Sequence, residues 1–364
     1  MNKILKQLLI VFMAVAFTGG IAIAETELVI VSWGGAYTAS QQKAYHEPYM
    51  KLNPDIKIIN DDSSGTGPAK LRAQIEAGNV TWDLLDALAA DAIALCDEGL
   101  VEVIDHDKDL APAPDGTPAS EDFGDLIACE CFIPTIVYST TFGYRTDKFA
   151  TPPTTIADVF NLKKFPGKRG LEKKPVGNLE WALIADGVAG NKVYDVLSTE
   201  KGVARAFKKL DTIKDSVIFW SEGAQPPQLL ADGEVVIASA YNGRLFNAIA
   251  AEKQPIEMLW DWQLYDLDGW VVPKGAPHKK EIMEYLRFGT DTQRLADQAK
   301  FISYGPARKS SAPMVSTHAE LGIDMKPHMP TALENSKQII VKDHSWWADH
   351  EVELTERFHA WLAR

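Results

Sequence analysis

Roughly the first hundred residues alternate between short apolar segments and segments with a helical pattern, and this alternation is the strongest constraint on the fold. The apolar segments, rich in β-branched and aliphatic residues as buried strands are, comprise residues 27–33, 56–60 and 82–88. The segments with a helical pattern comprise residues 37–52, 68–77 and 91–97. Strands that alternate with helices pair mostly in parallel and are covered on both faces. The sequence therefore predicts an α/β fold.

The chain is too long for one ordinary core, since about 340 of its 364 residues remain after a predicted leader is removed. An extended apolar segment at residues 134–144 leads into a second α/β region. The predicted helices and strands of that region comprise residues 181–188, 203–210, 217–220 and 235–240. Two α/β units joined by extended segments predict two lobes with a cleft between them, where small-molecule sites commonly lie.

The first 24 residues have the pattern of a secretory signal peptide. Lys3 and Lys6 precede an apolar stretch at residues 8–17, and Ala22 and Ala24 are the small residues of a cleavage site. The apolar stretch is short for a membrane-spanning helix, which disfavours the alternative of a membrane anchor. We expect an exported, periplasmic protein without stable membrane insertion.

Acidic residues outnumber basic ones, and the 50 Asp and Glu against 37 Lys and Arg give a net charge of −13. A chain this acidic is a poor partner for the phosphate backbone of nucleic acids or for anionic membrane surfaces. The motifs of common enzymes are also absent from the sequence, which has neither a Gly-x-Ser-x-Gly elbow nor His-Glu-x-x-His. We expect no nucleic-acid partner, no enzymatic activity, no cofactor and no bound metal.

Cys96, Cys129 and Cys131 are the cysteines of the chain. An oxidising compartment allows one disulfide and leaves one thiol free. Cys129 and Cys131 are two residues apart, which strains a mutual bond in an extended strand, so the pair Cys96–Cys131 is preferred. Three buried free thiols remain an equal alternative.

Seven segments resemble the solute receptors of ABC importers, in the polyamine-binding group with its γ-aminobutyrate-like members. They comprise Ser32-Trp33-Gly34-Gly35-Ala36-Tyr37 and residues 78–83, 134–139, 163–169, 225–234, 241–244 and 268–275. The resemblance implies a two-lobed type II periplasmic binding fold that closes by a hinge. It also implies a monomer without catalytic activity that delivers its ligand to an inner-membrane permease. The expected division is a signal peptide at 1–24, one lobe at 25–138 plus about 270–310, and a second at 139–269 plus about 311–364.

The resemblance places several side chains in a ligand site. Trp33 ends the first strand, Asp268 precedes a later one, and Tyr241 and Tyr304 fall where the family has pocket aromatic residues. Glu222 lies in a turn near another pocket segment. Polyamine receptors combine aromatic walls with carboxylates because buried ammonium groups need anionic partners and are attracted to aromatic faces.

Two positions depart from the diamine-binding pattern, since Gly35 and Arg244 stand where those members have aspartates. An arginine in a closed cleft repels a second ammonium group and can hold a carboxylate through two parallel hydrogen bonds. The sequence therefore predicts a zwitterion such as γ-aminobutyrate or another ω-amino acid. Asp268, helped by Glu222, is predicted to hold the ammonium group, and Arg244 the carboxylate.

Other predicted contacts come from the same segments. Trp33, Tyr37, Tyr138 and Tyr241 are predicted to surround the methylene chain. The remaining candidates are Gly35, Ala36, Ser139 and Asp62. Asp62 lies near the end of a strand, where ligands of α/β sheets bind, and a second anionic contact from it would favour a polyamine.

Each assignment has a structural alternative: Arg244 paired with Asp232 or Glu234 at the surface, Asp268 as a turn cap, Trp33 as a core residue and Glu222 as a surface residue.

The competing functions are a putrescine or spermidine receptor, a ferric-ion receptor and an exported enzyme. Iron would need clustered tyrosines. Tyr138, Tyr241 and Tyr304 are scattered in sequence and leave that option open, whereas Arg244 and Trp33 argue for an organic ligand. The enzyme would need Ser139 beside a histidine, which no spacing supports.

Overall fold

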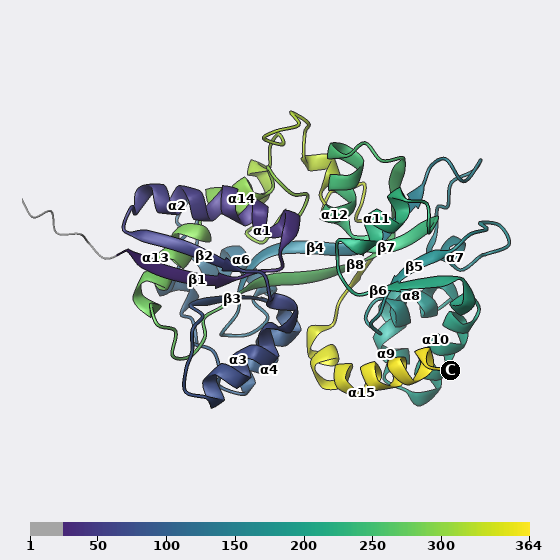
Figure 1. Ribbon diagram of the computed structural model, residues 1–364, viewed down its shortest axis with the longest axis horizontal. Helices are drawn as coiled ribbons and strands as arrows, with labels where there is room; N and C mark the ends of the chain where they lie inside the picture. Colours follow the sequence, from purple (N-terminus) through teal and green to yellow (C-terminus); the bar gives the residue numbers. More distant parts are fainter. Residues whose placement is uncertain (1–24) are drawn as a thin grey trace, which may run out of the picture.

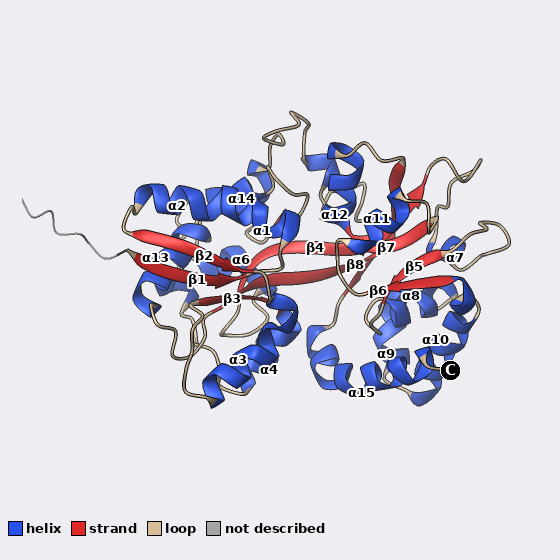
Figure 2. Ribbon diagram, in the orientation of Figure 1, coloured by secondary structure: helices blue, strands red, loops and turns tan. Residues whose placement is uncertain are grey.

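The computed structural model describes residues 25–364, so the predicted signal peptide lies outside the described residues. Within this range, ten strands form one sheet (Figures 1 and 2). They are β1 (Thr26–Val31), β2 (Ile56–Asp61), β3 (Leu84–Leu88), β4 (Ile133–Arg145), β5 (Arg169–Glu172), β6 (Val217–Trp220), β7 (Ile237–Tyr241), β8 (Ile256–Val271), β9 (Gly305–Pro306) and β10 (Ile339–Val341). The order across the sheet is β2-β1-β3-β8-β4-β7-β5-β6, with β9 and β10 paired to β4 and β8.

Parallel pairing dominates the two ends of the sheet. β1 is parallel to β2 and β3, and β5 is parallel to β6 and β7. The long strands β4 and β8 run antiparallel to each other and to their neighbours β7 and β3. The predicted α/β class is confirmed. The two parallel units are parts of one sheet because β4 and β8 extend through its centre (Figure 1).

Helices cover both faces of the sheet (Figure 2). The α-helices are α1 (Gly35–Gln41), α2 (Glu47–Leu52), α3 (Gly67–Glu76), α4 (Ala89–Asp97), α5 (His106–Asp109), α6 (Ala119–Phe123), α7 (Ile156–Val159), α8 (Asn178–Ala185), α9 (Val193–Leu197), α10 (Glu200–Asp211), α11 (Gln225–Ala231), α12 (Asn242–Phe246), α13 (Lys279–Gly289), α14 (Thr292–Gln298) and α15 (His344–Leu362). Two π-helical turns, η1 (Gln42–His46) and η6 (Asn247–Ala251), continue α1 and α12. Short 3₁₀ turns are η2 (Ser64–Thr66), η3 (Gly124–Leu126), η4 (Gly190–Lys192), η5 (Lys214–Ser216), η7 (Ala312–Met314) and η8 (Lys326–His328). The predicted helices and strands start and end within three residues of those observed.

The helix α10 shows how sequence pattern and packing agree. Thr199 caps its first turn by accepting a hydrogen bond from the Gly202 amide, as a threonine N-cap does. Val203, Ala206 and Leu210, spaced three and four residues apart, are buried on one face. The helix α15 is also capped and packed on one side. The Asp343 side chain accepts from the Trp346 amide at its start, and buried Trp347 and Phe358 pack in the core of the molecule.

Two hydrophobic cores define two halves of the molecule, which we call the β1 half and the β7 half. The core of the β1 half includes Leu28, Ile30, Leu84, Trp270 and Tyr285. The core of the β7 half includes Phe142, Leu171, Trp181, Ile237 and Trp347. The disulfide pairs Cys96 with Cys131, the preferred pairing, and leaves Cys129 as a half-buried thiol.

The long strands β4 and β8 each pack partly in one core and partly in the other, and the point of change can be compared with the predicted lobe boundaries. Along β8, Leu264 packs in the β7 half and Leu267 in the core of β1 and β3. Along β4, the change falls between Val137 and Phe142. The predicted boundary at 138/139 falls inside this β4 interval, and the one at 269/270 lies slightly beyond the β8 interval. The division into two lobes stays a prediction.

Candidate functional site

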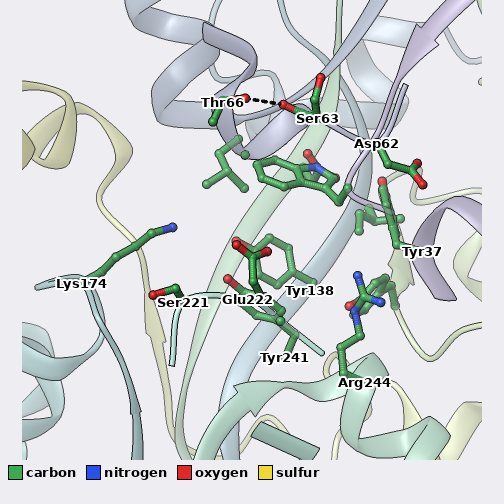
Figure 3. Close-up of a pocket in the computed structure, with 17 residues that line it drawn as sticks. Tyr37, Asp62, Ser63, Thr66, Tyr138, Lys174, Ser221, Glu222, Tyr241 and Arg244 are labelled. Carbon is green, nitrogen blue, oxygen red and sulfur yellow. Dashed lines mark hydrogen bonds between the residues drawn. The ribbon is translucent and has the colours of Figure 1, made fainter. Parts of the chain in front are cut away.

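A cavity of about 410 Å³ lies between the two halves (Figure 3). The β1 half contributes Trp33, Tyr37, Asp62, Ser63, Gly65, Thr66 and Leu88. The β7 half contributes Lys174, Ser221, Glu222, Gly223, Tyr241 and Arg244. The long strands and the segment before β9 contribute Ile136, Tyr138, Asp268 and Tyr304. Most of these residues end or follow parallel strands, as expected for a site in an α/β sheet.

Nine of the twelve predicted site residues line this cavity. They are Trp33, Tyr37, Asp62, Tyr138, Glu222, Tyr241, Arg244, Asp268 and Tyr304. Gly35, Ala36 and Ser139 do not line it, which corrects their prediction as direct contacts. Ser139 follows Tyr138 on β4, and because neighbouring residues of a strand point to opposite faces, its side chain points away from the cavity. The residue is fully buried, and its amide donates to Asn242 Oδ1 at 3.0 Å. Gly35 lies beside Arg244, which does line the cavity.

Tyrosine rings form one wall of the cavity. The ring of Tyr138 lies 5.6 Å from that of Tyr241 and 6.1 Å from that of Tyr304, both edge-on. The ring of Tyr37 lies 5.9 Å from that of Tyr304. Edge-on and tilted rings pack favourably and hold each other in place. The wall is therefore apolar and rigid, which suits a methylene chain.

Asp268 is the most buried carboxylate that lines the cavity, with 3% of the residue exposed. It lies on β8 directly opposite Leu88 of β3. Burial raises the pKa of Asp268 well above its usual value, and the nearby Asp86 carboxylate adds to the increase. Tyr37 and Trp33 lie close enough to oppose this increase, although neither contact has the geometry of a full hydrogen bond. Asp268 lies within β8 and not in a turn, which sets aside its alternative as a turn cap.

Arg244 reaches from α12 toward the β1 half, and Figure 3 shows its guanidinium pointing toward Tyr37. Its Nη2 donates to the carbonyl oxygen of Gly34 at 3.1 Å, and its buried Nε has no partner among the described residues. No salt bridge in the described part of the chain joins it to Asp232 or Glu234, which sets aside the surface alternative. A Cβ atom at Gly35 would lie 2.6 Å from Arg244 Nη1, so the missing side chain makes room for the guanidinium.

Two further carboxylates lie in more exposed positions. Asp62 Oδ1 accepts a hydrogen bond from Thr38 Oγ1 at 2.8 Å, and the residue is exposed. Glu222 is also exposed, with its carboxylate pointing toward Tyr138 in Figure 3. Solvent weakens the attraction of exposed carboxylates for a cation, so Asp268 offers the strongest ammonium partner of the three.

Sequence reasoning missed Lys174, a second cation at the cavity. Its ammonium group points into the space on the side opposite Arg244 in Figure 3. Half of the side chain is exposed (50%), and Nζ lies 3.3 Å from Glu172 Oε1. Glu172 also accepts a hydrogen bond from the Tyr241 hydroxyl at 3.1 Å. The position of Lys174 just after β5 is the signal that was available, because ligands bind at the carboxyl ends of parallel strands.

The site also bears on the iron and enzyme alternatives. Tyr138, Tyr241 and Tyr304 are far apart in the sequence but lie together at the cavity. However, the hydroxyl of Tyr138 donates to Asp266 and that of Tyr241 donates to Glu172, each at 3.1 Å. Burial and the adjacent carboxylates raise the pKa of both tyrosines well above the usual value, which opposes the phenolate form that ferric iron requires. Ser139 Oγ has no hydrogen-bond partner among the described residues, so no base activates it there.

An α/β molecule whose two halves enclose a cavity of aromatic and charged side chains is built to bind a small polar solute. The family model of bacterial extracellular solute-binding proteins matches residues 44–331, and the chain belongs to this family. Over 351 residues it is 37% identical to the "Gamma-aminobutyric acid-binding protein" of Pseudomonas aeruginosa, covering 96% of this chain and 94% of that protein.

Solved structures agree in fold. The PBP MotA from A. tumefaciens B6 in complex with glucopine matches with a TM-score of 0.80 and 29% identity, over 93% of this chain and 100% of that chain. The Atu4243-GABA receptor matches with a TM-score of 0.78 and 32% identity, over 93% and 98%. The predicted type II periplasmic binding fold is thereby confirmed. None of the helices in residues 25–364 is both long and apolar enough to cross a membrane.

Proposed function

We propose that this protein is the periplasmic receptor of an ABC importer for a zwitterionic ω-amino acid such as γ-aminobutyrate. The observation that carries the proposal is that Arg244 and the buried Asp268 line the same cavity. The two relatives named for γ-aminobutyrate support the same ligand class. The protein acts by capture and delivery and not as an enzyme.

Each end of the ligand has a chemically matched partner. The ammonium group binds Asp268, whose burial makes an ion pair strong because little water competes. The carboxylate binds Arg244, which lines the cavity and forms no salt bridge among the described residues. Charge-assisted hydrogen bonds of this kind contribute roughly 1.5–3 kcal/mol each. The two partners come from different halves, so one ligand connects both.

The methylene chain between the charged ends packs against aromatic rings. Tyr37, Tyr138 and Tyr241 line the cavity together with the indole of Trp33. Apolar chains gain free energy against such surfaces, and aromatic faces also attract the ammonium end by roughly 0.5–2 kcal/mol. The wall thus favours amines with an apolar spacer over compact polar solutes.

Putrescine or spermidine is the alternative cargo, and the charges of the cavity argue against it. A diamine would place a second ammonium group beside Arg244 or Lys174. The acids available to compensate, Asp62 and Glu222, are both exposed. Like charges in a closed cleft repel, and two exposed carboxylates attract too weakly to offset this repulsion.

Calorimetric titration tests the proposal directly. We expect γ-aminobutyrate to bind with a dissociation constant of roughly micromolar or below, equivalent to about −8 kcal/mol. Two matched ligands serve as controls: γ-aminobutyramide lacks the carboxylate charge, N-acetyl-γ-aminobutyrate lacks the ammonium charge, and both should bind far more weakly. Tight binding of putrescine without binding of the amino acid would overturn the proposal.

The remaining parts of the proposal concern the cellular setting. Export would follow from cleavage after Ala24, and delivery would occur at an inner-membrane permease. We infer a monomer with two hinged lobes, since both lobes must face the permease. Fractionation of cells that express the full chain tests the location, and light scattering of the purified protein tests the monomer.

A further inference from the structure

A second buried acid, Asp86, lies behind the cavity. In the antiparallel pair of β3 and β8, Leu88 is opposite Asp268 and Asp86 is opposite Trp270. Directly opposed residues and those two positions along share one face of the sheet, so Asp86 and Asp268 are diagonal neighbours on the same face. Asp86 is fully buried (0% exposed) and does not line the cavity, whereas Asp268 does.

Neither carboxyl group has a cationic partner. No salt bridge in the described part of the chain includes Asp86 or Asp268. Gln41 Nε2 donates to Asp86 Oδ2 at 2.8 Å, but Asp86 Oδ1 and Asp268 Oδ1 have no hydrogen-bond partner among the described residues. Two neighbouring buried carboxylates without a cation are strongly disfavoured as anions, because burial removes hydration and the like charges repel.

The groups around the pair are mostly neutral. The titratable side chains close to the pair are five tyrosines: Tyr37 from α1, Tyr45 from η1, Tyr138 from β4, Tyr285 from α13, and Tyr304. The charged side chains on adjoining elements are Asp266, two residues before Asp268 on β8, and Arg244, which lines the same cavity as Asp268. Asp266 is held as an anion by Lys342 at 2.9 Å. The other charged groups of the cavity are Asp62, Glu222 and Lys174. Burial raises the pKa of both Asp86 and Asp268, in agreement with this geometry.

We propose that Asp86 is a positioning residue that sets the charge state of Asp268: the two carboxyl groups form an uncharged pair in the ligand-free receptor, and an ammonium ligand that binds Asp268 releases one proton. The proton of the Asp268 carboxyl group passes to solvent as its oxygen accepts the ligand N–H, and the ligand stays an ammonium ion. This inference rests on the proposed function for the role of Asp268 as the ammonium partner.

The proposal makes ligand binding depend on pH in a defined direction. Below the pKa of the pair, each unit of pH should raise the affinity for an ammonium ligand about tenfold, because one proton must leave. Above that pKa, the pair has already lost one proton in the ligand-free receptor. The remaining proton then lies on Asp86 when the ligand binds Asp268, so there is no net proton release and the dependence on pH becomes flat.

Calorimetry in buffers of different ionisation enthalpy measures the released proton in the full protein. With γ-aminobutyrate as the probe, we expect release approaching one proton per ligand at about pH 6, and little release at about pH 9. If the amino acid does not bind, putrescine serves as the ammonium probe. Binding of either probe with no proton release at about pH 6 would overturn the proposal.

The variant Asp86→Asn keeps an oxygen that can accept the hydrogen bond from Gln41 and removes the second acid. We expect its affinity profile to shift to lower pH, with several-fold tighter binding under acidic conditions than the wild type. A merely structural role would instead weaken binding equally at every pH. Asp55→Asn removes an exposed acid of the same half and should leave the profile unchanged.

Infrared spectroscopy of the ligand-free receptor separates this inference from the proposed function. A protonated-carboxyl band at neutral pH that is reduced in Asp86→Asn supports the uncharged pair even if no ω-amino acid binds, in which case the proposed ligand alone is wrong. Absence of that band in the wild type would overturn the pair, and this measurement needs no variant to fold.

Discussion

Two segments of similar architecture face each other across the cavity and differ in charge. In the β1 half, β1 leads through Trp33 into α1, which continues into the π-helical turn η1. In the β7 half, β7 ends at Tyr241 and leads into α12, which continues into η6. The first segment carries an aromatic ring and two glycines, whereas the second carries an aromatic ring and Arg244.

This difference shows that one backbone arrangement can present either small residues or a cation beside the cavity. The glycines of the first segment leave the Gly34 carbonyl exposed to the guanidinium of the second. The acids of the β1 half, Asp86 and Asp268, come from the neighbouring strands and lie deep in the sheet. The cavity therefore offers a buried acid from the β1 half and a cation from the β7 half, and a zwitterion satisfies both at once.

The largest expected effect is the removal of the cation from the β7 half. Arg244→Gln should weaken γ-aminobutyrate binding by a factor on the order of 100 or more, because about two charge-assisted hydrogen bonds of 1.5–3 kcal/mol each are lost. Calorimetric titration measures this change. Arg205→Gln, which alters an exposed arginine paired with Asp186, is the control. If Arg244→Gln binds γ-aminobutyrate as tightly as the wild type, Arg244 does not hold the ligand carboxylate, and the charge difference between the halves does not select the ligand.

The next effect concerns the space that Gly35 leaves. Gly35→Ala should lower affinity by roughly tenfold, because the new Cβ displaces the guanidinium of Arg244 and a φ of +57° disfavours any side chain by about 1–2 kcal/mol. Gly78→Ala is a matched control, since Gly78 has a φ of +64° and open space around its Cβ position. Equal effects on ligand affinity in both variants would mean that strain alone acts.

A smaller effect is expected on the stability of the ligand-free protein. Carboxyl groups with a raised pKa in the folded state hold protons that the unfolded chain has lost above about pH 4, so folding stability falls as pH rises toward the folded pKa. The slope is at most about 1.4 kcal/mol per pH unit for each proton. Urea unfolding between about pH 5 and pH 8 measures it, and Asp86→Asn should show a shallower slope.

The smallest effect is expected at Lys174. Lys174→Met should change γ-aminobutyrate affinity by no more than about threefold, because the ammonium group is half exposed and already paired with Glu172. Putrescine binding should improve at the same time, since one repulsive charge is gone. Calorimetric titration of γ-aminobutyrate and putrescine against this variant measures both changes. A large loss of affinity for γ-aminobutyrate would mean that Lys174, and not Arg244, holds the ligand carboxylate.

Predictions from sequence succeeded where the signal is local. Apolar runs such as that of β1 and capped amphipathic segments such as α10 have periodicities set by the backbone itself, so their positions were predicted within three residues. Site residues inside recognisable motifs, among them Trp33, Tyr241 and Arg244, were also found. Their role in binding stays a prediction.

Other features depend on contacts between distant segments. The joining of two parallel units into one sheet requires β4 and β8 to cross the centre, which no local pattern indicates. Lys174 and the buried Asp86 resemble ordinary surface or capping residues when read along the chain. Only the pairing of β3 with β8 brings Asp86 beside Asp268.

The sequence by itself determined the class of fold, the family and the presence of an arginine where a diamine receptor would have an acid, because these are properties of local pattern and residue type. The tertiary structure decided which of the acids lose their water and which cation they face. Burial and distance, which set the strength of every charge in the cavity, arise only when segments far apart in the chain are packed together.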